Sequence, residues 1–236
     1  MKRTHFLRAT VAAVLAYTLA PAWAQGYPNK TVRVVIPFPP GGTLDFIGRT
    51  LAQKLSEQTG QTFVIENKPG GNGFIGADAV AKAPADGYTL LFNASTFTTG
   101  PMVVKSAPYD VNRDFTPVVL VAQAPLAVSV NNDLPVKDIA SLMSHAKATP
   151  GKLNSAIGST GSAGHLSTEL LKRAGGIELT IVPYKGTAPA FQDLVGGQVD
   201  EVPFVDAVVT SQVQLVETLV PLGVDRPVSR GLAHHR

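Results

Sequence analysis

The stretch VRVVIPFPPGGTLD, residues 32–45, decides the fold expected for this chain. It begins with an apolar, largely β-branched run that closes in prolines and a glycine pair. After the glycines, apolar side chains recur at helical spacing, at Leu44, Ile47, Leu51 and Leu55. The pattern predicts a strand over 32–38, a tight turn and an amphipathic helix, the usual opening unit of an α/β sheet.

The same alternation continues outward from this unit. The chain adds strands at 62–66 and 88–92 around a helix at 74–83, and then loses the pattern in a stretch rich in Pro, Asp and Asn over 101–117. An apolar stretch at 118–122 leads into a second series, with strands predicted at 126–130, 153–157 and 179–183 and helices at 138–148, 165–174 and 189–195. We therefore predict two α/β lobes, residues 25–123 and 124–224, each with helices packed on a sheet.

Residues 1–24 are predicted to be a secretory signal peptide. Lys2, Arg3 and Arg8 precede an uncharged, largely apolar segment, and Ala22-Trp23-Ala24 forms a small-x-small cleavage site. The apolar segment is about 12 residues long, whereas a membrane-spanning helix needs about 20. We expect an exported protein, which in a Gram-negative bacterium means the periplasm.

The charge balance argues against a nucleic-acid partner. The chain has 20 Lys and Arg against 17 Asp and Glu, a formal net charge of +3. Without the three basic residues of the predicted signal, the charges balance, so no basic face is expected to follow a phosphate backbone. The chain has no cysteine, which excludes disulfides, thiolate metal sites and a catalytic thiol.

Two glycine-rich loops join a predicted strand to a predicted helix. The first is PFPPGGTLD, residues 37–45, and the second is GSTGSAGH, residues 158–165. In a parallel sheet, ligands collect at the carboxyl ends of strands, where helix N-termini offer N–H groups to an anion. Taken alone, each loop is explained equally well as a turn with a helix cap. The presence of one such loop in each lobe favours a binding cleft between the lobes.

A third glycine motif is weaker. Residues 71–76, GNGFIG, match G-x-G-x-x-G, but the preceding NKPG lengthens the turn where a dinucleotide site needs it tight. We interpret this segment as a structural turn that contributes at most one wall of the cleft, and we expect no nucleotide or other cofactor.

Catalytic and metal-binding arrangements are scarce. No G-x-S-x-G nucleophile elbow occurs, and His234-His235 lies in an Arg/His-rich tail. Asp200-Glu201 would point to opposite faces of a strand, which makes shared acid/base work unfavourable. Ser162 with His165 remains as an alternative, an exported serine hydrolase, although nothing supplies an orienting acid. We expect no enzyme activity and no metal site.

Several of these segments together resemble the Bug-type substrate-binding proteins, the extracytoplasmic receptors of tripartite tricarboxylate transporters. The resemblance rests on PFPPGGTLDFIGR, VIENKPGGNGFIGADAVAKAPADGYTLL, GSTGSAGHLSTELLKRAGG and VPYKGTAPAFQDLVGGQVD, in this order between Tyr27 and Asp200. It implies a two-lobed, type II periplasmic-binding-protein fold that closes on a small organic carboxylate. It also implies a non-enzymatic monomer that delivers this ligand to membrane transport subunits.

The resemblance also implies which residues bind the ligand. The first-lobe wall would contain Phe38, Gly42, Thr43 and Asp45. In the second lobe the carboxylate would be received by Ser159, Thr160, Gly161, Ser162, Gly164 and His165. Tyr184-Lys185-Gly186 is expected to border the cleft.

The likeness to the family fails after Asp200. The chain continues with EVPFVDAVVTSQVQLVETLVPLGV and a tail at 225–236, where the family usually returns to the first lobe. We therefore expect a truncated or altered C-terminus that leaves apolar first-lobe surface uncovered. A further alternative is a remnant of the binding protein with no function.

Overall fold

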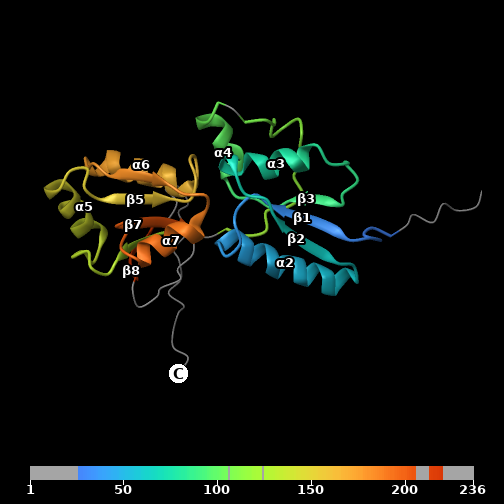
Figure 1. The fold of residues 1–236 in the computed structure, drawn as a ribbon, viewed down its shortest axis with the longest axis horizontal. Coiled ribbons are helices and arrows are strands. Elements are labelled where there is room, and N and C mark those ends of the chain that lie inside the picture. Colours follow the sequence, from blue (N-terminus) through green and yellow to red (C-terminus); the bar gives the residue numbers. More distant parts are fainter. Residues whose placement is uncertain (1–25, 106, 124, 206–212, 220–236) are drawn as a thin grey trace, which may run out of the picture.

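The computed structural model describes residues 26–105, 107–123, 125–205 and 213–219. Figure 1 shows two α/β lobes side by side, each with its own sheet. The predicted signal peptide at 1–24 and the tail at 225–236 lie outside the described residues.

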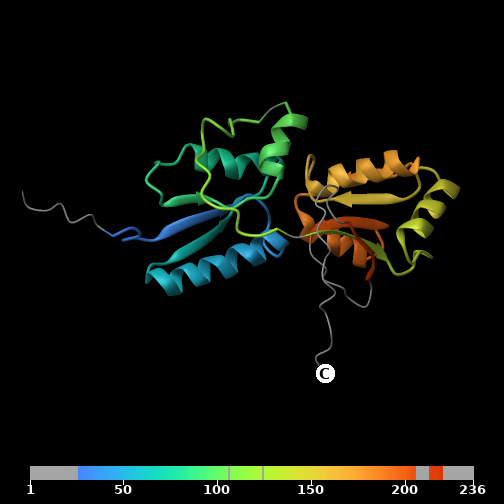
Figure 2. The same ribbon diagram turned by 180° about the vertical axis from the view of Figure 1, so that it is seen from behind.

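The first lobe is a parallel three-stranded sheet in the order β2-β1-β3. Its strands are β1 (Val32–Ile36), β2 (Phe63–Asn67) and β3 (Thr89–Leu91). Helix α2 (Thr43–Thr59) lies on one face, and α3 (Phe74–Ala81) and α4 (Thr96–Val103) lie on the other, as Figure 2 shows from behind. Because both faces of β1 are covered, four of its five residues are buried, which explains its continuous β-branched run.

The second lobe is a five-stranded mixed sheet in the order β6-β5-β7-β4-β8. Its elements follow the chain as β4 (Leu126–Asn131), α5 (Ile139–Ala148), β5 (Asn154–Ile157), α6 (Ala163–Gly175), β6 (Thr180–Pro183), α7 (Thr187–Val195), β7 (Glu201–Val205) and β8 (Val213–Leu219). Strand β5 runs parallel to β6 and β7, whereas β4 is antiparallel to β7 and β8. Buried aliphatic side chains such as Val128, Leu142 and Leu194 form the core of this lobe.

These elements confirm the predicted α/β class and most of the predicted helices and strands, with two differences. Strands β7 and β8 were not predicted. Helix α4 was not predicted either, and it includes Pro101 at the start of the stretch predicted to be irregular. The apolar stretch at 118–122 leads into β4 without forming a strand of its own, and Val118, Val119 and Leu120 are 81%, 74% and 71% exposed.

The tolerance of α4 for Pro101 has a specific cause. Proline lacks the N–H that would bond the carbonyl of Phe97 four residues earlier. The Tyr109 hydroxyl donates to that carbonyl instead, at 3.0 Å, and its ring stacks on Phe97 with centroids 5.2 Å apart. Burial raises the pKa of Tyr109 to about 12, so the hydroxyl remains a donor at neutral pH. Tyr109 thus replaces the missing hydrogen bond.

In the described part of the chain, no helix is both long enough and apolar enough to cross a membrane.

Glu201 is an unusual feature of the second-lobe core. Its side chain is fully buried, and within the described residues neither carboxylate oxygen has a hydrogen-bond partner. Burial raises its pKa to about 7, and the nearby Ser155 hydroxyl opposes this rise. Ser155 Oγ is also hydrogen-bonded to Thr168 Oγ1, at 3.2 Å. The neighbouring Asp200 accepts hydrogen bonds from Asn154, and its charge raises the pKa of Glu201 further.

We predict that Glu201→Gln stabilises the protein above pH 7. The folded state holds its proton to higher pH than the unfolded state, so the wild-type stability falls as pH rises from about 4.5 to about 7. The full penalty is on the order of 3 kcal/mol. Urea unfolding at pH 5 and pH 8 measures it; equal pH dependence in wild type and variant would contradict the assignment.

Candidate functional site

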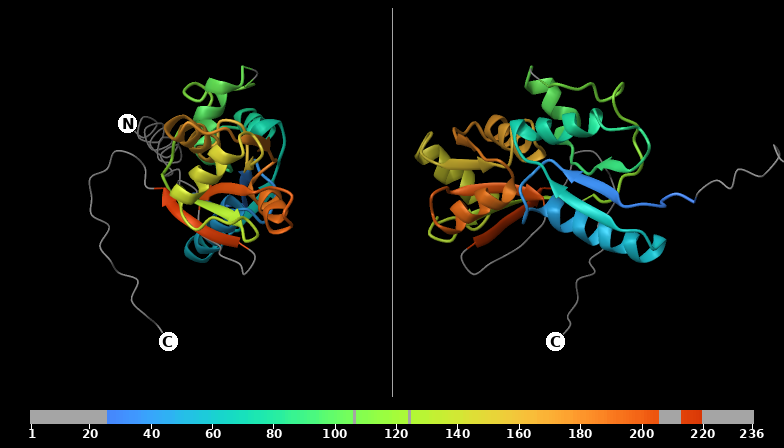
Figure 3. Two further views of the ribbon diagram at one scale, coloured as in Figure 1. Left: turned by 90° about the vertical axis from the view of Figure 1, so that its left-hand side faces the viewer. Right: turned by 45° about the vertical axis from the view of Figure 1, so that its right-hand side comes forward.

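The loops that follow the strands of both lobes meet at one seam between the lobes (Figure 3). In the first lobe these are residues 37–42 after β1 and 68–73 after β2, and in the second they are 158–162 after β5 and 184–186 after β6. The carboxyl edge of a parallel sheet is the usual place for a ligand. We call these four segments the seam loops.

The seam loops are in contact across the lobes. A Cβ atom added to Gly186 would lie 3.1 Å from Pro39 Cδ, and one added to Gly42 would lie 3.1 Å from Thr187 Oγ1. On the other side of the seam, the Asn72 amide donates to the Thr160 carbonyl at 2.7 Å. The two lobes are therefore in direct contact at the seam.

Asp45 holds the shape of the first seam loop. Its side chain is buried beneath the loop and accepts hydrogen bonds from the Gly41 N–H at 3.0 Å, Arg49 Nε at 2.9 Å and Asn67 Nδ2 at 2.9 Å. Asn67 also donates to the Phe38 carbonyl. Burial alone would raise the pKa of Asp45, but the hydrogen bonds from Arg49, Gly41 and Asn67 outweigh it and lower the pKa. Asp45 is thus an ionised support under the loop.

The second-lobe loop is held by its own side chains. Ser162 is the N-cap of α6, and its Oγ accepts from the His165 N–H at 3.1 Å. His165 Nδ1 accepts from the Gly161 N–H at 3.0 Å, which leaves Nε2 as the protonated nitrogen of the neutral ring. The Ser162 hydroxyl hydrogen is still available to donate, because the cap uses only the oxygen.

The electrostatics of the seam favour an anion. Helices α2, α6 and α7 all begin there, at Thr43, Ala163 and Thr187. Helix geometry leaves their first N–H groups without intrahelical partners and places a partial positive charge at each start. Arg49 is engaged by Asp45 and Asn67, so these starts offer mainly neutral donors.

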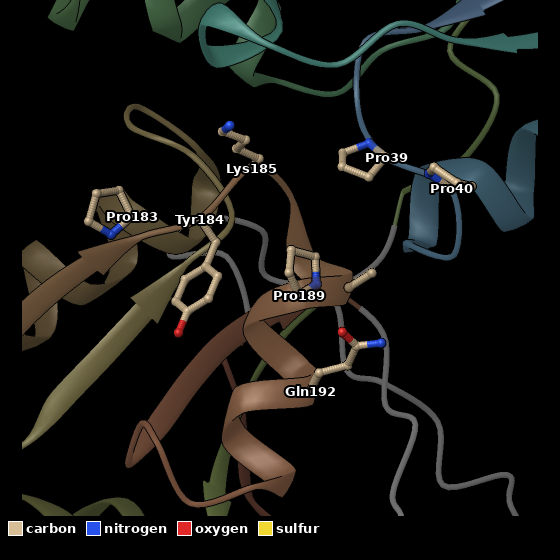
Figure 4. A pocket seen from close by; sticks show the side chains of 8 residues that line it. Pro39, Pro40, Pro183, Tyr184, Lys185, Pro189 and Gln192 are labelled. Carbon is tan, nitrogen blue, oxygen red and sulfur yellow. The ribbon is translucent and has the colours of Figure 1, made fainter.

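A shallow cavity of about 560 Å³ opens at one end of the seam. Figure 4 shows Pro39 and Pro40 facing Tyr184, Lys185, Pro189 and Gln192 across it, with Pro183 and Ala188 completing the lining. The Tyr184 hydroxyl turns away and bonds Asp193, while Lys185 is exposed. The expectation that Tyr184-Lys185-Gly186 borders the space between the lobes is confirmed.

The structure places the predicted site residues in three different roles. Phe38, Gly42 and Thr43 lie at the seam, as do Ser159, Thr160, Gly161, Ser162 and His165. Asp45 lies beneath the loop with its oxygens already bonded. Gly164 is buried against the β7 strand, since a Cβ there would be 2.7 Å from the Pro203 carbonyl oxygen. The last two residues shape the loops.

Three seam residues escaped the sequence reasoning: Asn72, Thr99 and Thr187. Asn72 belongs to the third glycine motif, in which Gly71, Asn72 and Gly73 all have positive φ. This confirms that motif as a structural turn. An asparagine between two glycines was the available sequence signal for Asn72, because asparagine tolerates a left-handed backbone. The sequence offered no signal for Thr99.

The hydrolase alternative has no support in this geometry. Ser162 Oγ and His165 Nδ1 are both used to hold the loop, and in the described residues no carboxylate bonds the His165 ring. Nor do the described residues contain a group of three His, Cys, Asp or Glu that could hold a metal ion.

Comparison with known proteins finds a family model and several similar chains. Residues 47–221 match the model of the "Tripartite tricarboxylate transporter family receptor". The "UPF0065 protein in tcbD-tcbE intergenic region" of Pseudomonas sp. (strain P51) is 40% identical over 222 residues, which cover 92% of this chain and 65% of that protein. The chain therefore spans slightly less than two thirds of that relative's length.

Two solved structures are similar in fold and sequence. The structure of R. palustris Rpa4515 with adipate has a TM-score of 0.78 and 40% identity, over 81% of this chain and 66% of that one. The periplasmic binding protein BugD has a TM-score of 0.76 and 35% identity over the same shares of the two chains.

We predict that Asp45→Ala loosens the first seam loop. Removing a buried charged acceptor should cost about 2 kcal/mol at neutral pH and speed hydrogen exchange at the Gly41 amide. The wild-type contribution is complete above the ordinary aspartate pKa of about 3.9 and is lost as pH falls toward the lowered folded value. Denaturant unfolding between pH 7 and pH 3 measures this.

Glu57→Ala is the control for Asp45→Ala, because Glu57 lies on the same helix in an exposed pair with Lys54, where an ion pair contributes little. Equal losses in both variants would contradict the supporting role of Asp45.

We predict that Gly161→Ala opens the lobes. The new Cβ would lie 2.6 Å from Val103 Cγ2 of the first lobe. Gly151→Ala is a matched control, since φ is +70° there and +78° at Gly161, but nothing lies within 4 Å. Small-angle X-ray scattering should give a larger radius of gyration for Gly161→Ala alone, and an unchanged radius would contradict the contact.

Proposed function

Because the chain belongs to the tripartite tricarboxylate transporter receptor family, we propose that it captures a small organic carboxylate between its lobes. It would then deliver this ligand to the membrane subunits of a tripartite transporter. The protein is a receptor and has no enzymatic activity, as its family membership implies.

One observation carries the proposal: glycine-rich loops at the carboxyl ends of strands in both lobes face each other across one seam. Helix starts on both sides then aim N–H groups at the same space. An anion between them gains from donors of both lobes, whereas in an open form it would gain from only one. Binding therefore favours the closed arrangement by a population shift.

The proposed ligand contacts follow from the donors at the starts of the helices. We assign the carboxylate to the start of α6, where the Ser162 hydroxyl and the N–H groups of Thr160 and Ala163 can donate. Thr43 and Gly42 complete the opposite wall at the start of α2. Ser159, Gly161 and His165 keep the receiving loop in shape, and Phe38 screens it from water. Charged groups strengthen hydrogen bonds to neutral donors, so no cation is required.

The ligand class rests on one relative. The R. palustris protein is described with adipate, a six-carbon dicarboxylate. A second carboxylate could extend toward the cavity beside Lys185. We propose a small dicarboxylate as the ligand, a periplasmic location as for BugD, a monomeric state, and lobes at 25–123 and 124–224.

We predict that adipate or a similar acid raises the melting temperature of the protein. At 100 times its dissociation constant, a ligand adds about 2.7 kcal/mol to the stability of the folded state, which shifts the midpoint by several degrees. Thermal melts should be recorded with adipate, malate, glutamate, citrate and nicotinate. 1,6-Hexanediol is the control for adipate, since it keeps the chain length and lacks the carboxylates.

Ser162→Ala tests the assigned contact. It removes a helix cap as well, which costs about 1 kcal/mol, so Asp138→Ala at the cap of α5 is the matched variant. Both should lower the melting temperature without ligand, but only Ser162→Ala should reduce the ligand-induced shift. A melt that no acid shifts, or a shift equal with hexanediol, would overturn the proposed function.

A further inference from the structure

We propose that Asn72 and Thr99 form a latch. When the protein closes, the latch holds the second-lobe seam loop at residues 158–162, called the ligand loop below, against the first lobe. This proposal rests on the proposed function and extends it. The two residues set the fraction of molecules in the closed form, and that fraction sets how tightly a carboxylate binds.

Both latch bonds cross the seam to adjacent carbonyls of the same loop. Asn72 Nδ2 donates to the Thr160 carbonyl at 2.7 Å, and Thr99 Oγ1 donates to the Gly161 carbonyl at 2.5 Å. The donors come from the loop after β2 and from α4 of the first lobe, and the acceptors lie between β5 and α6 of the second. The two lobes thus share a pair of neighbouring hydrogen bonds at the ligand loop.

The backbone fixes the direction of the Asn72 amide. Asn72 has φ 61° and ψ 29° between two glycines that also have positive φ. Asparagine tolerates this left-handed conformation better than most residues, and it also supplies the amide donor. A glycine here would keep the backbone and lose the donor, which makes the two roles separable.

Thr99 has two acceptors for one hydroxyl hydrogen. Its Oγ1 lies 2.9 Å from the Ser95 carbonyl of its own helix and 2.5 Å from the Gly161 carbonyl across the seam. Since the hydroxyl carries one hydrogen, it can bond Ser95 when the lobes are apart and Gly161 when they close. The donor is therefore satisfied in both states.

Close packing supports the latch on the same side of the seam. A Cβ on Gly161 would meet Val103 Cγ2 at 2.6 Å and the Gly100 Cα at 3.3 Å. Helix α4 is fixed in turn by Phe97, which stacks on Tyr109 and contacts Phe115 edge-on. The latch donors sit on supported elements.

The latch controls the peptide groups that line the ligand position. The Gly161 N–H is bonded by His165 and the Ser162 N–H by the Ser159 carbonyl. The carbonyls of the same two peptide units belong to Thr160 and Gly161. Among the described residues, these carbonyls accept hydrogen bonds only from Asn72 and Thr99 of the first lobe. The loop is therefore held on both sides only when the lobes are closed, which preorganises its remaining donors for an anion.

Two variants remove the latch without straining the protein. Asn72→Gly keeps the positive φ and removes the amide, and Thr99→Val keeps the shape and removes the hydroxyl. Thr98→Val is the matched control, because Thr98 bonds the same Ser95 carbonyl at 2.8 Å and is exposed, with no bond across the seam. Thr99→Ser restores the hydroxyl and should rescue the loss.

The lobe separation can be measured directly because the chain has no native cysteine. Cysteines introduced at the exposed positions Gln53 on α2 and Lys147 on α5 carry spin labels for distance measurement by electron paramagnetic resonance. Without ligand, Asn72→Gly and Thr99→Val should shift the distribution toward longer distances, whereas Thr98→Val and Thr99→Ser should match wild type.

The affinity for adipate gives the second readout. Losing one net hydrogen bond of the closed state should weaken binding about two- to tenfold per variant. Unchanged distances and unchanged affinity in both latch variants would overturn the latch. Wider distances in a protein that binds no adipate would support the latch and count against the proposed ligand, so the two failures are distinguishable.

Discussion

In a parallel β-α unit, every helix begins at the carboxyl edge of its sheet, and both lobes of this protein turn that edge toward each other. The rest of the site depends on this constraint. It brings the starts of α2, α6 and α7 to one seam, where N–H groups that lack intrahelical partners and partial positive charges accumulate. The glycines at the seam let side chains of the opposite lobe approach the backbone, as the short distances at Gly42, Gly161 and Gly186 show. This arrangement supports the anionic ligand that we propose.

Two buried carboxylates, those of Asp45 and Glu201, have pKa values shifted in opposite directions. Asp45 accepts three hydrogen bonds and stays ionised as a support for the first seam loop, residues 37–42. Glu201 is fully buried with no hydrogen-bond partner among the described residues, and burial raises its pKa to about 7. The first carboxylate contributes to the geometry of the seam, while the second carries a stability cost that grows with pH. Only Asp45 positions a seam loop.

Much of the fold could be predicted because β1, α2 and their repeats follow simple hydrophobic periods. Helix α4 could not, because its stability depends on Tyr109, whose hydroxyl bonds the Phe97 carbonyl that Pro101 leaves without a donor. Two of the four seam loops, residues 37–42 and 158–162, were also predictable from their glycine and hydroxyl content. The separate roles of Asp45 and Gly164 were not, since they depend on Asn67 and Pro203, which are distant in sequence. Asn72 illustrates the same limit, because its partner Thr160 lies in the other lobe.

We expect one carboxylate to contact both lobes at the seam. Backbone amide NMR during a titration with adipate tests this contact. Chemical shifts should change at residues 41–43 and 159–165 and saturate together with one dissociation constant. Shifts confined to one lobe, or different dissociation constants at the two loops, would contradict it.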